Sequence, residues 1–213
     1  MDDSKHRIKG ILAGMLLGDG CIGMTKSTCY FRMTHTEKQR EYLMHKVKLL
    51  EELTLVKIHE NPPRGKKHPN VEIMATSRTH PLYKRLREIF YVEGKRTITP
   101  TILSWLTVEG LALWYMDDGS TTSNYSCYIA THAFPLVQVE VIVDFLYTRF
   151  GLKFTILTDR DKYKITITKS ECVKFFDMIR PYIVPSMSYK LDYKAMKLLR
   201  MKGTVKGEEP VRP

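Results

Sequence analysis

Residues 11–20, Ile-Leu-Ala-Gly-Met-Leu-Leu-Gly-Asp-Gly, form an apolar stretch that ends in one carboxylate and one glycine. Residues 111–119, Leu-Ala-Leu-Trp-Tyr-Met-Asp-Asp-Gly, repeat this pattern. Asp19 and Asp118 are 118 − 19 = 99 residues apart in a chain of 213. Because this interval is too long for a solenoid repeat, it predicts two fused copies of one small domain.

The two apolar stretches predict a pair of buried helices, because each is apolar almost all round. Glycines recur on one face of the first helix, at Gly10, Gly14 and Gly18. Such a face lets another backbone approach closely, so we expect the helices to pack side by side with Asp19 and Asp118 together. Gly20 and Gly119 follow the acids, and we expect each to cap its helix with a positive φ.

At these residues the chain resembles the LAGLIDADG homing endonucleases. Residues 12–20 match the nine-residue motif in type at most positions and depart from it at Leu17, which replaces an acid. The second copy is looser, with Leu113 where the family often has glycine and Asp117 where a small residue is usual. The resemblance is to the monomeric, two-motif branch, and it covers residues 8–202. It implies a site-specific double-strand DNA endonuclease of the kind carried by mobile introns.

The predicted fold is α+β, with a pseudo-two-fold duplication of an αββαββα unit over residues 1–100 and 101–202. We expect residues 203–213 to be a disordered tail, because they are charged and rich in Pro and Gly. Besides the motif helices, apolar periodicity predicts helices over 37–53, 78–90, 136–150, 170–179 and 189–201. It predicts strands over 21–24, 28–36, 54–60, 70–75, 120–124, 125–132, 153–158 and 163–168. The resemblance implies that the two antiparallel sheets form a saddle over DNA.

Alternation along the strands gives each predicted sheet one polar face. A two-stranded ribbon fits the major groove, where Arg can read guanine. In the first sheet this face carries Tyr30, Arg32, Thr34, Glu72 and Met74. In the second sheet it carries Lys162, Lys164 and Thr166, beside Arg160 in the turn. The Pro-rich loop over 61–69 adds Arg64, Lys66 and Lys67, which we expect to grip phosphates.

The carboxylates at the helix ends predict a metal site. An unpaired buried carboxylate is costly, and a bound divalent cation offsets that cost. Phosphodiester hydrolysis needs an activated water and stabilisation of charge, both of which such an ion supplies. Oxygen ligands favour Mg²⁺, with Mn²⁺ as the alternative. We assign Asp19 and Asp118 as metal ligands, one for each DNA strand. Asp117 is the alternative ligand in the second half, and Gly18, beside Asp19, is a further candidate ligand.

The family also carries a basic residue near each active centre. By this resemblance Lys190 is the candidate for one centre, and either Lys95 or Arg96 for the other. Each could polarise the water or stabilise phosphate charge, but an arginine cannot act as a base at neutral pH. Simple phosphate contact is the alternative role for all three.

Composition is consistent with a nucleic-acid partner. The net charge of +11 favours a polyanion, and no stretch is long and apolar enough for a membrane span. The four cysteines form no CxxC pair, which argues against zinc and a disulfide framework. We therefore expect a monomeric intracellular protein of the cytoplasm, nucleoid or an organelle matrix that binds double-stranded DNA. Two alternatives are an intron maturase that binds RNA and a non-catalytic DNA-binding regulator.

Overall fold

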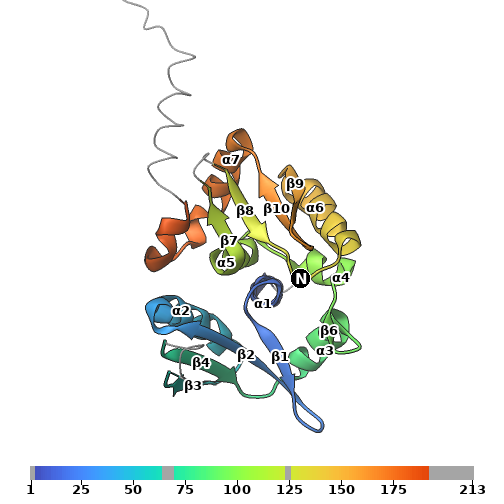
Figure 1. Cartoon of the computed structure of the whole chain (residues 1–213). Coiled ribbons are helices and arrows are strands. Elements are labelled where there is room, and N and C mark those ends of the chain that lie inside the picture. Colours follow the sequence, from blue (N-terminus) through green and yellow to red (C-terminus); the bar gives the residue numbers. More distant parts are fainter. Residues whose placement is uncertain (1–2, 64–69, 123–125, 192–213) are drawn as a thin grey trace, which may run out of the picture.

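The two motif stretches form a pair of buried helices at the centre of the molecule (Figure 1). The computed structural model describes residues 3–63, 70–122 and 126–191. In it, α1 spans Asp3–Leu17 and α5 spans Val108–Asp118. Every residue of α1 from Gly10 and of α5 from Gly110 to Met116 is buried. The predicted pairing of two buried helices is thus confirmed.

The first sheet follows the first motif helix. Its order is β1-β2-β4-β3, and all its pairs are antiparallel. Alternation buries Cys29, Phe31 and Met33 on the inner face and leaves Arg32 and Thr34 exposed, as predicted. The strands are β1 (Cys21–Met24), β2 (Cys29–Thr36), β3 (Val56–Asn61) and β4 (Glu72–Ser77). Its helices are α2 (Arg40–Glu51), which follows a 3₁₀ turn over Glu37–Gln39, and α3 (Pro81–Phe90).

The second sheet repeats this arrangement after the second motif helix. Its order is β7-β8-β10-β9, again with antiparallel pairs, so the two sheets have the same topology. The fold is therefore α+β with two antiparallel sheets, as predicted. The strands are β7 (Gly119–Thr121), β8 (Cys127–Ala130), β9 (Phe154–Asp159) and β10 (Lys162–Ile167). The helices are α6 (Leu136–Phe150), whose bounds match the prediction, and α7 (Lys169–Ile179).

The connection between the halves contains structure that we did not predict. A short hairpin joins β5 (Tyr91–Val92) to β6 (Lys95–Arg96) through Glu93 and Gly94, both with positive φ. Helix α4 (Pro100–Trp105) follows it, and the Thr99 hydroxyl accepts a hydrogen bond from the Ile102 N–H at its start. These elements are too short for periodicity to reveal.

Some predicted boundaries were wrong near the helix ends. Helix α3 begins at Pro81 rather than residue 78, because the His80 ring accepts the Leu82 N–H. Helix α7 begins at Lys169 rather than at residue 170. After 3₁₀ turns over Arg180–Tyr182 and Pro185–Leu191 the described residues end. The predicted helix beyond residue 191 and the expected tail over 203–213 lie outside them.

Glycines bring the two motif helices into backbone contact. A Cβ at Gly14 would overlap the carbonyl oxygen of Gly110, and a Cβ at Gly110 would overlap that of Gly10. Gly110 therefore supplies the close approach that Leu113 in the second motif could not. The positive φ expected at Gly20 and Gly119 is wrong, since the described positive-φ glycines are Gly94 and Gly151. Space is the requirement instead, because a Cβ at Gly20 would lie 2.7 Å from the Met15 carbonyl oxygen.

Gly14→Ala is expected to lower the free energy of unfolding by about 1–3 kcal/mol, the usual cost of overpacking. The new methyl group would meet the Gly110 backbone, which cannot rotate away as a side chain could. Urea denaturation measures the change, with His6→Ala as the control, an exposed position of the same helix where stability should change by no more than about 0.5 kcal/mol. Equal stability of the Gly14→Ala variant and the wild type would contradict this packing.

No helix within the described residues combines the length and apolar character that crossing a membrane requires. Cys21, Cys29, Cys127 and Cys172 are all free thiols.

Candidate active site

The ends of the two motif helices touch through one hydrogen bond. Helix α1 ends at Leu17, so Asp19 lies beyond it, with 46% of its side chain exposed. The Asp19 backbone N–H donates to Oδ2 of Asp117 in the last turn of α5, at 3.1 Å. Gly18 permits this contact, because a Cβ there would overlap the Asp117 carboxylate. The two acidic motif ends are therefore brought together.

Three carboxylates share this place, and the pKa of two of them, Asp19 and Asp118, is raised. Burial, together with the charges of Asp19 and Asp117, raises the pKa of Asp118 to about 7. Desolvation by the surrounding protein and the charge of Asp117 also raise the pKa of Asp19. Raised carboxyl pKa values mean that negative charge is unfavourable here in the absence of a cation. A divalent ion would relieve this repulsion, which is the property expected of a metal site.

One basic side chain contacts the backbone beside each candidate acid. Arg96 donates to the carbonyl oxygens of Gly18, at 2.9 Å, and Gly20, at 2.6 Å, on either side of Asp19. Lys190 donates from Nζ to the carbonyl oxygen of Asp117, at 2.9 Å, directly before Asp118. Lys95 is exposed at the hairpin instead. The contact that Lys190 makes in one half is thus made by Arg96 in the other.

A buried ammonium lies beside Asp117. Lys46 on α2 is fully buried, and its Nζ lies 2.5 Å from Oδ1 of Asp117, whose side chain is also inaccessible. The same Nζ lies 3.0 Å from Nε2 of His35, near the end of β2. Burial and the Lys46 charge lower the pKa of His35 to about 4, so the ring is neutral at pH 7. Because an ammonium only donates, Nε2 accepts, and the ring proton on Nδ1 faces Oε1 of Gln39 at 3.2 Å.

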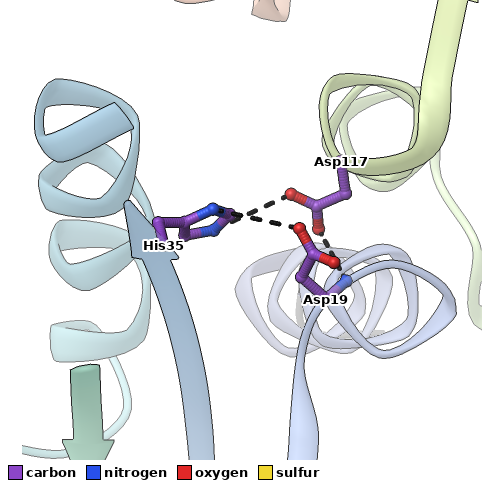
Figure 2. A group of neighbouring side chains, drawn as sticks. All are labelled: Asp19, His35 and Asp117. Carbon is purple, nitrogen blue, oxygen red and sulfur yellow. Dashed lines mark hydrogen bonds and ion pairs between the residues drawn. The ribbon is translucent and has the colours of Figure 1, made fainter. Parts of the chain in front are cut away.

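Figure 2 shows His35, Asp19 and Asp117 pointing toward one another from β2 and the two motif helix ends. Each offers one ligand atom, and these atoms lie within 4.8 Å of one another. Both oxygens of Asp117 already have protein partners, however, and the Gly18 carbonyl accepts from Arg96. Asp19 keeps an exposed carboxylate, so it is the most available cation ligand of this group.

Sequence reasoning missed His35 and Lys46. Lys46 follows Tyr42 by four residues and precedes Leu50 by four, so it falls on the buried face of α2. A lysine on an apolar helical face is the signal that could have found it. His35 likewise continues the buried positions of β2, two residues after Met33.

The predicted DNA contacts fall partly within the described residues. Side chains on the outer face of the first sheet are Tyr30, Arg32, Thr34, Glu72 and Met74, half-buried or exposed. In the second sheet Arg160 and Lys162 are exposed, and Lys164 is half-buried, with its Nζ 3.0 Å from Oδ2 of Asp159. Arg64, Lys66 and Lys67 lie outside the described residues.

The chain is similar to known proteins over most of its length, including both motifs. The LAGLIDADG DNA endonuclease family matches residues 9–175. A probable intron-encoded endonuclease 1 of Wickerhamomyces canadensis is 29% identical over 193 residues, 84% of this chain and 81% of the relative. The cytochrome b mRNA maturase bI2 of Debaryomyces hansenii is 26% identical over 190 residues, 85% of this chain and 72% of the relative. The solved structure of the homing endonuclease I-WcaI bound to its DNA recognition sequence superposes with a TM-score of 0.77. It is 26% identical and covers 87% of this chain and 86% of that one.

Proposed function

Because the chain belongs to the LAGLIDADG DNA endonuclease family, we propose that it is a site-specific homing endonuclease that hydrolyses one phosphodiester in each strand of a duplex. The observation that carries the proposal is the contact between the two motif helix ends, where the Asp19 N–H donates to Asp117 directly before Asp118, with the pKa of both candidate acids raised. A relative that was solved bound to its DNA recognition sequence matches this fold over most of the chain, and this likeness supports double-stranded DNA as the partner. Two motifs in one chain supply both acids, so the active form is a monomer.

Asp19 and Asp118 would hold the divalent ion, Mg²⁺ or Mn²⁺. Their oxygen ligands suit hard cations, and their raised pKa values favour a site that a cation occupies. The bound ion supplies charge stabilisation and an acidified water. Asp117 acts by holding Asp19, since its own oxygens are engaged by the Asp19 N–H and by Lys46.

Arg96 and Lys190 would fix the backbone beside the two acids and present positive charge to the scissile phosphates. Arg96 fills the place that Lys95 could have taken, because Arg96 contacts the backbone around Asp19. As an arginine it cannot remove a proton at neutral pH. Burial lowers the pKa of Lys190, the direction that favours a basic role.

The outer faces of the two sheets would bind the duplex. Arg32 and Thr34 are exposed on the first sheet, and Lys162 is exposed on the second. The excess positive charge of the chain would add affinity that falls with salt. The target would fill the saddle between the sheets with its cleavage sites over the two helix ends.

The test is cleavage of the duplex formed by joining the sequences on either side of the reading frame. Purified protein is expected to cut both strands with Mg²⁺ and to stop when EDTA is in excess. A target selected from a randomised duplex library by metal-free binding is a second substrate. Stable binding to that target without cleavage in Mg²⁺ or Mn²⁺ would overturn the nuclease proposal in favour of a non-catalytic DNA-binding protein.

A second candidate is a maturase, which the relative from Debaryomyces hansenii favours. Both functions could retain Asp19 and Asp118, so the acids do not separate them. Affinity for the host intron RNA and for the duplex should be measured at one salt concentration. Tighter RNA binding, with loss of intron splicing when the protein is removed, would identify the maturase.

Asp118 is expected to make the metal-free protein less stable as the pH rises. The pKa of its carboxyl is raised, so its contribution is fully present below about pH 4 and is lost as the pH rises through about 7. Asp118→Asn should match the wild type at pH 4 and exceed it at pH 8 by on the order of 2 kcal/mol, less than the full shift implies because water still reaches the group. Urea unfolding in EDTA measures both proteins, and titrating groups that do not interact with Asp118 cancel in the difference. Parallel pH profiles would contradict the expected repulsion.

A further inference from the structure

The two halves can be superimposed residue by residue from their strand registers. Arg32 in β2 and Tyr128 in β8 each pair with the residue that follows the motif glycine. Helix α2 begins eight residues after Arg32 (40 − 32), and α6 begins eight residues after Tyr128 (136 − 128). From β2 through α2 the two halves therefore correspond without a gap.

This correspondence shows that the buried pair between Lys46 and Asp117 has no counterpart. Lys46 corresponds to Ile142, which is fully buried and apolar. Asp117 precedes the second catalytic acid as Gly18 precedes the first. His35 corresponds to Thr131, whose hydroxyl donates to the Tyr163 carbonyl oxygen at 2.8 Å. The charge pair therefore joins Lys46 of the first half to Asp117 of the second, whereas the corresponding positions hold Ile142 in the second half and Gly18 in the first.

The pair compensates for a difference in helix length. Helix α5 continues through Asp118, whereas α1 ends at Leu17, two residues before Asp19. The amides of Gly18 and Gly20 still bond back to Gly14 and Met15 of α1, but the Asp19 amide bonds to Asp117. The Asp117 carboxylate is in turn fixed by Lys46 through its other oxygen. Asp19 is therefore held by a chain of contacts that reaches α2.

Resting on the nuclease function proposed above, we propose that Lys46 and Asp117 are positioning residues for the Asp19 centre alone, so that the enzyme cuts one DNA strand with their help and the other without it. Among the described residues, the Lys46 ammonium makes polar contacts with Asp117 and His35, and the Asp117 carboxylate in turn accepts from the Asp19 N–H. Asp118 is held by α5 itself and by Lys190 on the preceding carbonyl oxygen.

The double variant Lys46→Ile/Asp117→Gly tests this directly, because it copies the residues of the other half and leaves no unpaired buried charge. Each strand of the target duplex carries a different end label, and the two nicking rates are measured in one reaction. One strand should be cut about tenfold or more slowly, as for a displaced catalytic group, and the other within about twofold of the wild-type rate. Equal slowing of both strands, or of neither, overturns the proposal.

A matched control removes another ion pair that joins the first half of the chain to α5. Arg7 on α1 binds Glu109 on α5 at 2.7 Å. It lies at the opposite end of the helices, about 15 Å from the end of α1 at 1.5 Å per residue. Arg7→Met/Glu109→Gln should leave the ratio of the two strand rates unchanged. A changed ratio here would show that any loss of contact between the helices has this effect.

A readout that needs neither DNA nor metal separates this proposal from the nuclease function. In an amide NMR spectrum of the free protein, the Asp19 N–H resonance should move upfield in Lys46→Ile/Asp117→Gly, because its acceptor is gone, and stay in place in the Arg7 control. An unmoved Asp19 resonance overturns the positioning role. Wild-type protein that cuts neither strand while the resonance moves would overturn the nuclease function instead.

Discussion

Asp19→Asn is expected to bind the target duplex as the wild type does. It should cleave one strand, the one assigned to the Asp19 centre, about a thousandfold more slowly. The change keeps the shape of the side chain but removes the negative charge that holds the cation. Charge stabilisation by a catalytic ion contributes several kcal/mol, and about 4 kcal/mol corresponds to three powers of ten in rate. The Asp19 side chain is exposed beside Asp117 rather than packed in the core, so the variant should fold.

The measurement is single-turnover cleavage in Mg²⁺, with binding measured in EDTA. Asp118→Asn should have a comparable effect on the other strand. Asp144→Asn is the matched control, because Asp144 is an exposed carboxylate on α6, away from both motif helices. A double variant Asp19→Asn/Asp118→Asn that cleaves at the wild-type rate would exclude the two acids as metal ligands.

Local pattern was sufficient to predict the elements that place this site. The apolar motif stretches gave the buried helices, and alternation in residues 29–36 gave the inner face of β2. The bounds of α6 followed from its long apolar periodicity. These predictions hold because burial of one face is decided by neighbours within the same element.

Contacts between distant residues could not be predicted in this way. Lys46 and Asp117 are 71 residues apart, and only the packing of α2 against the end of α5 brings them together. The choice between Lys95 and Arg96 depended on a two-residue strand whose pairing points Arg96 toward Gly18. A glycine was expected at position 20 because of a positive φ. The structure instead requires glycine there because a Cβ would be crowded by Phe31 and Met15, and a contact with Phe31 cannot be predicted from local pattern.

Lys46→Met is expected to lower the free energy of unfolding by about 3–5 kcal/mol, the usual cost of breaking a buried ion pair from one side. Methionine approximates the volume of the lysine stem but leaves Asp117 with one partner, the Asp19 N–H. The Asp117 side chain is inaccessible to water, so hydration cannot replace the lost ammonium. The Nε2 atom of His35 also loses its donor.

Urea denaturation is the suitable measurement, since an ionic denaturant would itself screen charges. Lys46→Ile/Asp117→Gly should recover much of the loss, because replacing both buried charges avoids the unpaired one. Lys48→Met is the control on the same helix: Lys48 is exposed, and its replacement should change stability by no more than about 0.5 kcal/mol. If Lys46→Met were as stable as Lys48→Met, the ammonium would contribute nothing to the fold, and Asp117 would need another explanation for being charged and buried between the two halves.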